Sequence, residues 1–308
     1  MNNSLSREKQ KLKIKRYLFV LSIIILPLIN FIVFYLVQNF SSFIMAFQVK
    51  KQGISYWSFD NYARIFREFT QSDRSSDLYI SLINTFKFFF LGIIMLPVSF
   101  LTSYFMYKKI FLHGVFKIVF FLPSILSAVV WSSIFKLVLE PTGPIARFIQ
   151  FINHEENPVV LLGEYKYALA TVMAYSVWMG IAGNFILFGG ALSRIPVEVI
   201  EAGQLDGIGW FTEMTRVIVP LIFPTLSTLL LLQLTGLFTS SGNILLLTGG
   251  SYNTSTISYF IFENVYKVAQ TSNKYNYAAS VGLIFTVITL PIVFVSRWLL
   301  NKVEDVQY

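Results

Sequence analysis

The sequence has no cysteine and few charged side chains. The lack of cysteine among its 308 residues excludes disulfides, thiolate metal sites and thiol catalysis. Charged residues make up 13% of the chain, whereas soluble domains carry about a quarter. Hydrophobic residues make up 55%. Such a chain has too little polar surface to cover itself in water, so the composition favours a membrane protein.

Side chains suited to enzyme chemistry are scarce as well. The chain has no Gly-x-x-x-x-Gly-Lys-Ser/Thr motif, so the usual phosphate cradle for ATP is missing. Its two histidines, His113 and His154, fall on opposite sides of the membrane in the predicted topology and cannot share a metal. The pair Glu155-Glu156 is interpreted as a solvated turn. We predict no catalytic residue and no metal site.

The net charge of +8 would suit nucleic acid if the cations formed a dispersed basic face. They gather instead before the first apolar stretch, which is a signal of membrane orientation. We therefore expect a cytoplasmic N-terminus and no nucleic-acid partner. The clustered cations are Arg7, Lys9, Lys11, Lys13, Lys15 and Arg16.

Six apolar stretches are long enough to cross a bilayer. The first is longer than the core of a signal peptide and lacks a clear cleavage site, so we expect it to be retained. The sequence predicts an all-α membrane protein with a cytoplasmic N-terminus (1–16), a six-helix domain (17–300) and a cytoplasmic tail (301–308). The expected spans are Tyr17–Val37, Ile80–Met106, Val115–Leu137, Tyr167–Gly190, Pro220–Ser240 and Tyr277–Leu300.

None of these spans has a carboxylate near its centre, where ion-coupled carriers usually place one. Lys87, Lys117, Lys136 and Arg297 fall near span ends, where long side chains can reach the interface. The pattern argues against an ion-driven carrier.

A polar segment, residues 195–207, lies between the fourth and fifth spans on the cytoplasmic side. Pro196 suits the first turn of a helix, and Asp206-Gly207 is a turn signal. The spacing places Val197, Ile200, Leu205 and Ile208 on one apolar face. A second apolar stripe follows, made of Trp210, Phe211, Met214, Val217 and Ile218. Two short helices with an apolar face and carboxylates at its edge favour docking of another protein.

This segment resembles the coupling-loop signature of ABC importer permeases, Glu-Ala-Ala, three residues, Gly, nine residues, Ile-x-Leu-Pro. Glu201, Ala202, Gly207 and Pro220 match in register. Gly203 replaces the second alanine, and valines at 217 and 219 replace the isoleucine and leucine. The Ile195-Pro196 lead-in, Asp206 and the later Thr248-Gly249-Gly250 are similar to the maltose-type, carbohydrate-uptake branch.

The resemblance implies a permease in the bacterial cytoplasmic membrane, with both termini cytoplasmic. It implies four kinds of partner besides membrane lipid: a second homologous permease, two ATPase subunits, an extracellular solute-binding protein and a carbohydrate substrate. ATP and Mg²⁺ would be held by the ATPases, and this chain would hold no cofactor.

The resemblance also gives roles to residues of the coupling loop, taken as 191–219. Glu201 would meet a basic residue of an ATPase, while Ala202 and Gly203 would let the helix seat closely. Asp206 and Gly207 would set the turn. Pro220 would pass the movement into the fifth span.

Polar and aromatic side chains in the fourth and fifth spans are the expected substrate path, because sugars bind through hydroxyl hydrogen bonds and ring contacts. A permease for a non-sugar solute, an ion-coupled carrier and a structural or signalling membrane protein remain alternatives. The expected path residues are Trp178, Asn184, Gln233, Ser240, Ser241 and Asn243.

Overall fold

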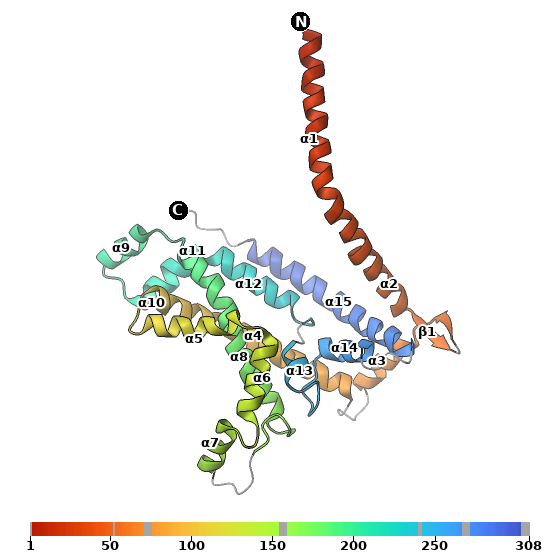
Figure 1. Cartoon of the computed structure of the whole chain (residues 1–308), viewed down its shortest axis with the longest axis vertical. Coiled ribbons are helices and arrows are strands. Elements are labelled where there is room, and N and C mark those ends of the chain that lie inside the picture. Colours follow the sequence, from red (N-terminus) through yellow and green to blue (C-terminus); the bar gives the residue numbers. More distant parts are fainter. Residues whose placement is uncertain are drawn as a thin grey trace. The chain divides into compact units, whose positions relative to one another are not determined.

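The computed structural model describes residues 2–51, 53–70, 76–153, 159–239, 242–266 and 272–302. The chain divides into two compact units. The first comprises Met1–Ile65 and Ala269–Leu283, and the second comprises Phe66–Val268 and Ile284–Tyr308. Helices predominate in both, as the sequence predicted (Figure 1).

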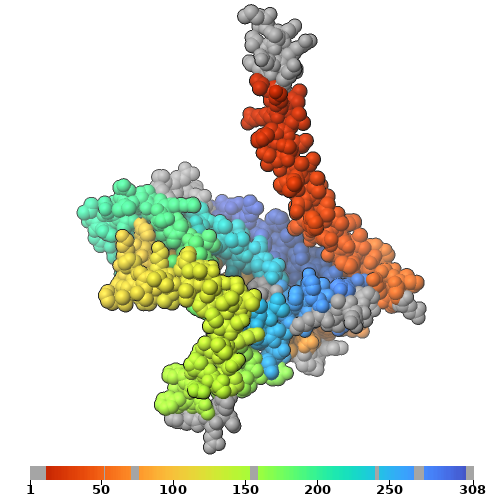
Figure 2. All heavy atoms as spheres, viewed as in Figure 1, coloured from red at the N-terminus to blue at the C-terminus, as the bar shows by residue number. Residues whose placement is uncertain are grey.

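The first unit begins with a long helix that is exposed from residue 12 to residue 43. It comprises α1 (Asn2–Asn30), the π-helical η1 (Phe31–Leu36) and α2 (Val37–Ala46). Its apolar part, Leu12–Ala46, is 35 residues long, well beyond the predicted span Tyr17–Val37. Leucine, isoleucine and phenylalanine side chains are exposed along this helix, which is red in Figure 2. A surface this apolar suits contact with lipid rather than water.

A β-hairpin follows, which is a local departure from the predicted all-α fold. Strand β1 (Gln48–Lys51) pairs antiparallel with β2 (Ile54–Trp57), and Gly53 turns the chain with φ +84°. The Gln48 carbonyl accepts hydrogen bonds from the side-chain amides of Asn61, at 3.1 Å, and Asn276, at 2.8 Å. Within this unit the hairpin is thus fixed to α3 (Asp60–Thr70) and to the start of α15 (Ser272–Leu300).

The second unit is built around two long helices, α4 (Asp77–Tyr107) and α8 (Ala168–Leu192), which pack along one another. Ser76 caps α4, because its side chain accepts a hydrogen bond from the Tyr79 amide at 3.2 Å. Phe100 of α4 contacts Phe188 of α8, with ring centroids 5.6 Å apart.

The predicted third span is broken. Helices α5 (His113–Ile125) and α6 (Ala128–Leu139) meet at a sharp bend, and α7 (Pro144–Asn153) follows. The stretches on either side of the break lie at 111°. Pro123 lies one turn before the break, and Ser127 caps α6 by accepting from the Val130 amide.

The region of the predicted fifth span is bent as well. The coupling loop contains α9 (Val197–Leu205), α10 (Trp210–Thr212) and the π-helical η2 (Glu213–Ile218). Helix α11 (Val219–Leu221) then meets α12 (Phe223–Thr235) at 74°, near Pro224. Helices α13 (Gly242–Leu247) and α14 (Ile257–Tyr266) follow, and the part of α15 from Ile284 onward also belongs to this unit.

Within the described residues, four helices are individually long and apolar enough to cross a membrane. The number reaches six if each bent pair counts as one span, which is the number predicted.

Candidate functional site

Helix α9 has the ends that its sequence predicts. It begins after Pro196, whose extended backbone leads into the first turn. Gly207 adopts φ +71°, a left-handed conformation that glycine accepts without strain. The Ile208 amide donates to the Gly203 carbonyl at 3.2 Å and closes the end of the helix. The predicted helix and turn are therefore present.

The predicted apolar face of α9 is partly buried within the chain and partly exposed, and its use as a docking surface stays a prediction. Ile200 joins the core between α4 and α8, but Val197 is 59% exposed and Leu205 is 89% exposed. Glu201, Ala202 and Asp206 are exposed beside them. Helix α9 (teal in Figure 1) lies at the edge of the second unit. Its exposed side chains are both apolar and acidic.

In this structure the side chain that closely approaches Gly203 is Ile208 of the same chain. A Cβ at this position would lie 2.7 Å from Cδ1 of Ile208, so the missing side chain lets the turn fold back onto the helix. Seating against an ATPase remains a prediction for Ala202 and Gly203.

A buried ion pair ties the coupling loop to α4. Glu213, at the start of η2, is only 3% exposed. The Lys108 ammonium donates to both of its carboxylate oxygens, at 2.9 and 3.0 Å. The Tyr104 hydroxyl lies 3.3 Å from this carboxylate and 3.3 Å from the Trp210 carbonyl, so it can donate to one of them at a time. A movement of η2 must therefore move the end of α4 or break this pair.

Neither member of this pair was predicted as a site residue from the sequence. The available signal was a lone carboxylate, Glu213, within the apolar stripe from Trp210 to Ile218. Of that stripe, Met214 and Ile218 are buried in the core, whereas Trp210 and Phe211 are exposed.

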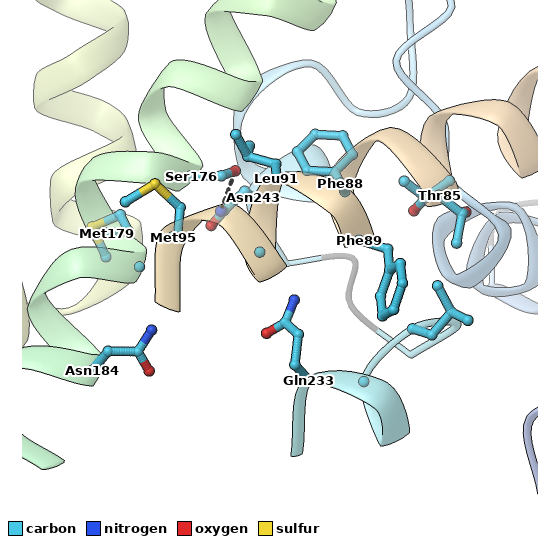
Figure 3. A pocket seen from close by; sticks show the side chains of 15 residues that line it. Thr85, Phe88, Phe89, Leu91, Met95, Ser176, Met179, Asn184, Gln233 and Asn243 are labelled. Carbon is cyan, nitrogen blue, oxygen red and sulfur yellow. Dashed lines mark hydrogen bonds between the residues drawn. The ribbon is translucent and has the colours of Figure 1, made fainter. Parts of the chain in front are cut away.

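A cavity of about 340 Å³ lies between α4, α8 and α12 (Figure 3). Asn184 of α8 and Gln233 of α12 both line it, as does Asn243 at the start of α13. The Asn243 side-chain amide donates to the Ser176 hydroxyl at 2.7 Å. Three of the predicted path residues are thus brought together. The remaining lining residues are Thr85, Phe88, Phe89, Leu91, Gly92, Met95, Ser176, Met179, Gly180, Gly236, Leu237 and Thr256.

Trp178 is placed differently from its prediction. It does not line the cavity but packs edge-on against Trp131, with ring centroids 4.7 Å apart. The neighbouring cluster is apolar and includes Tyr175 and Tyr259, which explains its position. Ser240 and Ser241 lie outside the described residues.

Gly92 was not predicted as a site residue, yet it sets the shape of the cavity. A Cβ on Gly92 would collide with the side-chain amide of Gln233. Gln233 therefore reaches across the cavity only because residue 92 has no side chain. Among the described residues, no group of three or more histidine or acidic side chains could hold a metal ion.

The sequence from residue 90 to residue 305 matches the profile of the binding-protein-dependent transport system inner membrane component. The chain belongs to this family. The match includes the coupling loop and most of the cavity lining, and it makes the chain a multi-pass membrane protein of a transport family rather than an enzyme.

This inner membrane component has several named relatives. It is 33% identical over 194 residues to the multiple sugar-binding transport system permease protein MsmF of Streptococcus mutans, covering 62% of this chain and 64% of the relative. A match to the probable ABC transporter permease protein YurN of Bacillus subtilis covers 60% of that relative. Both matches therefore span less than two thirds of the relative's length. The arabinooligosaccharides transport system permease protein AraP of Bacillus subtilis is 24% identical over 285 residues, covering 87% and 84%.

The fold of this inner membrane component also matches a solved structure. A chain of a bacterial ABC transporter involved in the import of the acidic polysaccharide alginate superposes with a TM-score of 0.79. It is 21% identical and covers 94% of this chain and 98% of that one. At this identity the likeness establishes the fold alone.

Proposed function

We propose that this chain is the permease subunit of a carbohydrate-importing, binding-protein-dependent ABC transporter, and that it forms half of the translocation path. The observation that carries the proposal is a family match that spans both the coupling loop and the polar cavity. Relatives named for sugar and arabinooligosaccharide transport support carbohydrate as the substrate class.

The proposal includes partners that supply energy and substrate. Two ATPase subunits with ATP and Mg²⁺, and a second homologous permease, would complete the transporter in the bacterial cytoplasmic membrane. One of the solved alginate transporters is a complex with a periplasmic protein bound to an alginate pentasaccharide, which supports a solute-binding partner here. Both termini of the chain would be cytoplasmic.

The geometry suggests how ATP closure would reach the cavity. Glu201 and Leu205 would dock in a cleft of an ATPase, and the Glu213–Lys108 pair would pass the movement of η2 to the end of α4. The same helix carries Gly92, which faces Gln233 of α12. Pro220 lies in α11, at the C-terminal end of the coupling loop and just before α12. A rigid element with two positions would thus couple two distant sites.

Replacing the cavity amides tests the proposed substrate path. Asn184→Leu and Gln233→Leu should each lower carbohydrate uptake by about threefold to tenfold, because each removes one hydrogen-bonding partner of a sugar hydroxyl. The measurement is ATP-dependent uptake by the complete transporter in proteoliposomes, with panels of labelled carbohydrates, amino acids and peptides.

Asn264→Leu is the matched control, since the Asn264 amide bonds the carbonyl of Phe260 in its own helix, outside the cavity. Uptake of amino acids or peptides in place of carbohydrates would contradict the proposed function. Unchanged carbohydrate uptake in both cavity variants would show that Asn184 and Gln233 do not line the substrate path.

A smaller change tests the shape of the cavity. Gly92→Ala should displace the Gln233 amide and lower uptake to a similar extent as Gln233→Leu. Gly183→Ala is the control, because a Cβ there meets no atom within 4 Å. The double variant Gly92→Ala/Gln233→Leu should be no worse than either single variant. Additive losses in the uptake assay would show that the two positions act separately.

A further inference from the structure

A second pocket, of about 260 Å³, lies at the opposite end of α4 from the coupling loop. Lys87, which lines it, is 17 residues before Tyr104, or about 26 Å along a helix. If the coupling loop is cytoplasmic, this pocket faces the side from which substrate arrives. We call it the outer pocket. It is lined by Tyr79, Ile80, Ile83, Asn84, Lys87, Tyr165, Leu169, Tyr252 and Asn253.

One wall of the outer pocket is a strained loop. Tyr252 and Asn253 have φ +56° and +58°, a left-handed conformation that is unfavourable for a bulky residue such as tyrosine. Strain of this kind persists only where the surroundings fix it, and it clusters at ligand sites.

Asn84 of α4 helps to hold this loop in its strained conformation. Its side chain is 2% exposed, and its amide donates to the carbonyls of Asn253, at 2.6 Å, and Ser255, at 2.9 Å. On the far side of the loop the Tyr259 hydroxyl donates to the Gly249 carbonyl at 2.7 Å. The loop is therefore held in a form that presents Tyr252 to the pocket. There its ring meets that of Tyr165 edge-on, with centroids 5.5 Å apart.

Lys87 places a positive charge in this aromatic pocket. It lies ten residues into α4 and is exposed. Among the residues that the structure describes, it forms no ion pair and no hydrogen bond. It lines the outer pocket together with tyrosine rings and amide groups, and its place at the membrane interface stays a prediction.

We propose that the outer pocket binds one carboxylate-bearing sugar unit, a uronic acid residue, on its way to the cavity. The tyrosine rings supply apolar surface for a sugar face, their hydroxyls bond sugar hydroxyls, and the Lys87 ammonium pairs with the carboxylate. Sites for drug-sized ligands have volumes of about 300–1,000 Å³. The outer pocket, at about 260 Å³, is slightly smaller, so it fits one sugar ring rather than a chain of them. This inference rests on the proposed function and narrows its substrate class.

The test compares two disaccharides that differ only in one carboxylate, cellobiouronic acid and cellobiose. Binding to the complete transporter in nanodiscs is measured by saturation-transfer NMR and titration, with the solute-binding protein omitted. Lys87→Gln should weaken cellobiouronic acid binding by about tenfold and leave cellobiose unchanged, and Lys87→Arg should retain binding. Tyr165→Leu should weaken both ligands, and its exposed ring makes misfolding a small concern.

Three results would overturn the proposal. They are no binding of cellobiouronic acid to the wild type, equal binding by Lys87→Gln, and, in a parallel pull-down with the solute-binding protein added back, a Lys87→Gln defect confined to capture of that protein, which would assign Lys87 to a protein carboxylate. The proposed function is judged separately, because ATP-dependent uptake of any carbohydrate by the same transporter in proteoliposomes upholds it whatever the outer pocket binds.

Discussion

Lys108→Met should strongly destabilise the coupling loop. It leaves the Glu213 carboxylate buried without its partner, and breaking buried pairs costs about 3–5 kcal/mol. Because the Lys108 side chain is 26% exposed, water can reach the site and the lower end of that range applies. We expect a lower melting temperature of the purified complex and ATP hydrolysis that no longer tracks uptake.

The double variant Lys108→Met/Glu213→Gln separates stability from coupling. With no charge left in the site, much of the lost stability should return. The rigid link between η2 and α4 would still be missing, so the number of substrate molecules moved per ATP should stay low. The reversed pair, Lys108→Glu/Glu213→Lys, should restore part of both. If the neutral double variant transports with wild-type coupling, the pair is structural only.

Glu201→Lys should weaken docking of the ATPase by about tenfold or more, because the proposed contact of this exposed carboxylate with a basic residue would become a contact between like charges. Insertion into the membrane should be unchanged, since Glu201 makes no contact that holds the fold in the described part of the chain. The measurement is co-purification of the ATPase together with substrate-stimulated ATP hydrolysis.

Glu198→Lys is the control for Glu201→Lys, with the same change of charge one turn earlier on α9. A general effect of charge would affect both variants equally. Wild-type assembly and hydrolysis in Glu201→Lys would remove the proposed role of that residue.

Local sequence signals predicted the coupling helix well. Pro196 and Asp206-Gly207 fix its two ends through backbone geometry alone, and the structure contains both. The amides Asn184, Gln233 and Asn243 could also be singled out, because polar groups are rare in apolar spans and these three line the cavity.

Features that depend on distant partners could not be predicted in the same way. Glu213 and Lys108 form an ion pair although they are 105 residues apart in the sequence, and no local sequence pattern connects them. Helical spacing places Leu205 and Ile200 on the same apolar face, but only Ile200 is buried by the rest of the fold. Hydropathy alone predicted neither the 111° break after α5, which follows Pro123, nor the hairpin at Gln48–Trp57.

We propose that helix α9 lies on the cytoplasmic side of the membrane and is the docking site of an ATPase. Every other proposed coupling step depends on this cytoplasmic position of α9. The lack of native cysteine makes a direct measurement possible, with Leu205→Cys and Tyr165→Cys probed by a membrane-impermeant maleimide. We predict that Leu205→Cys reacts only in inside-out vesicles and is protected when the ATPase is bound, while Tyr165→Cys reacts in intact cells. Reaction of Leu205→Cys in intact cells would contradict the account, because no ATPase could then reach α9.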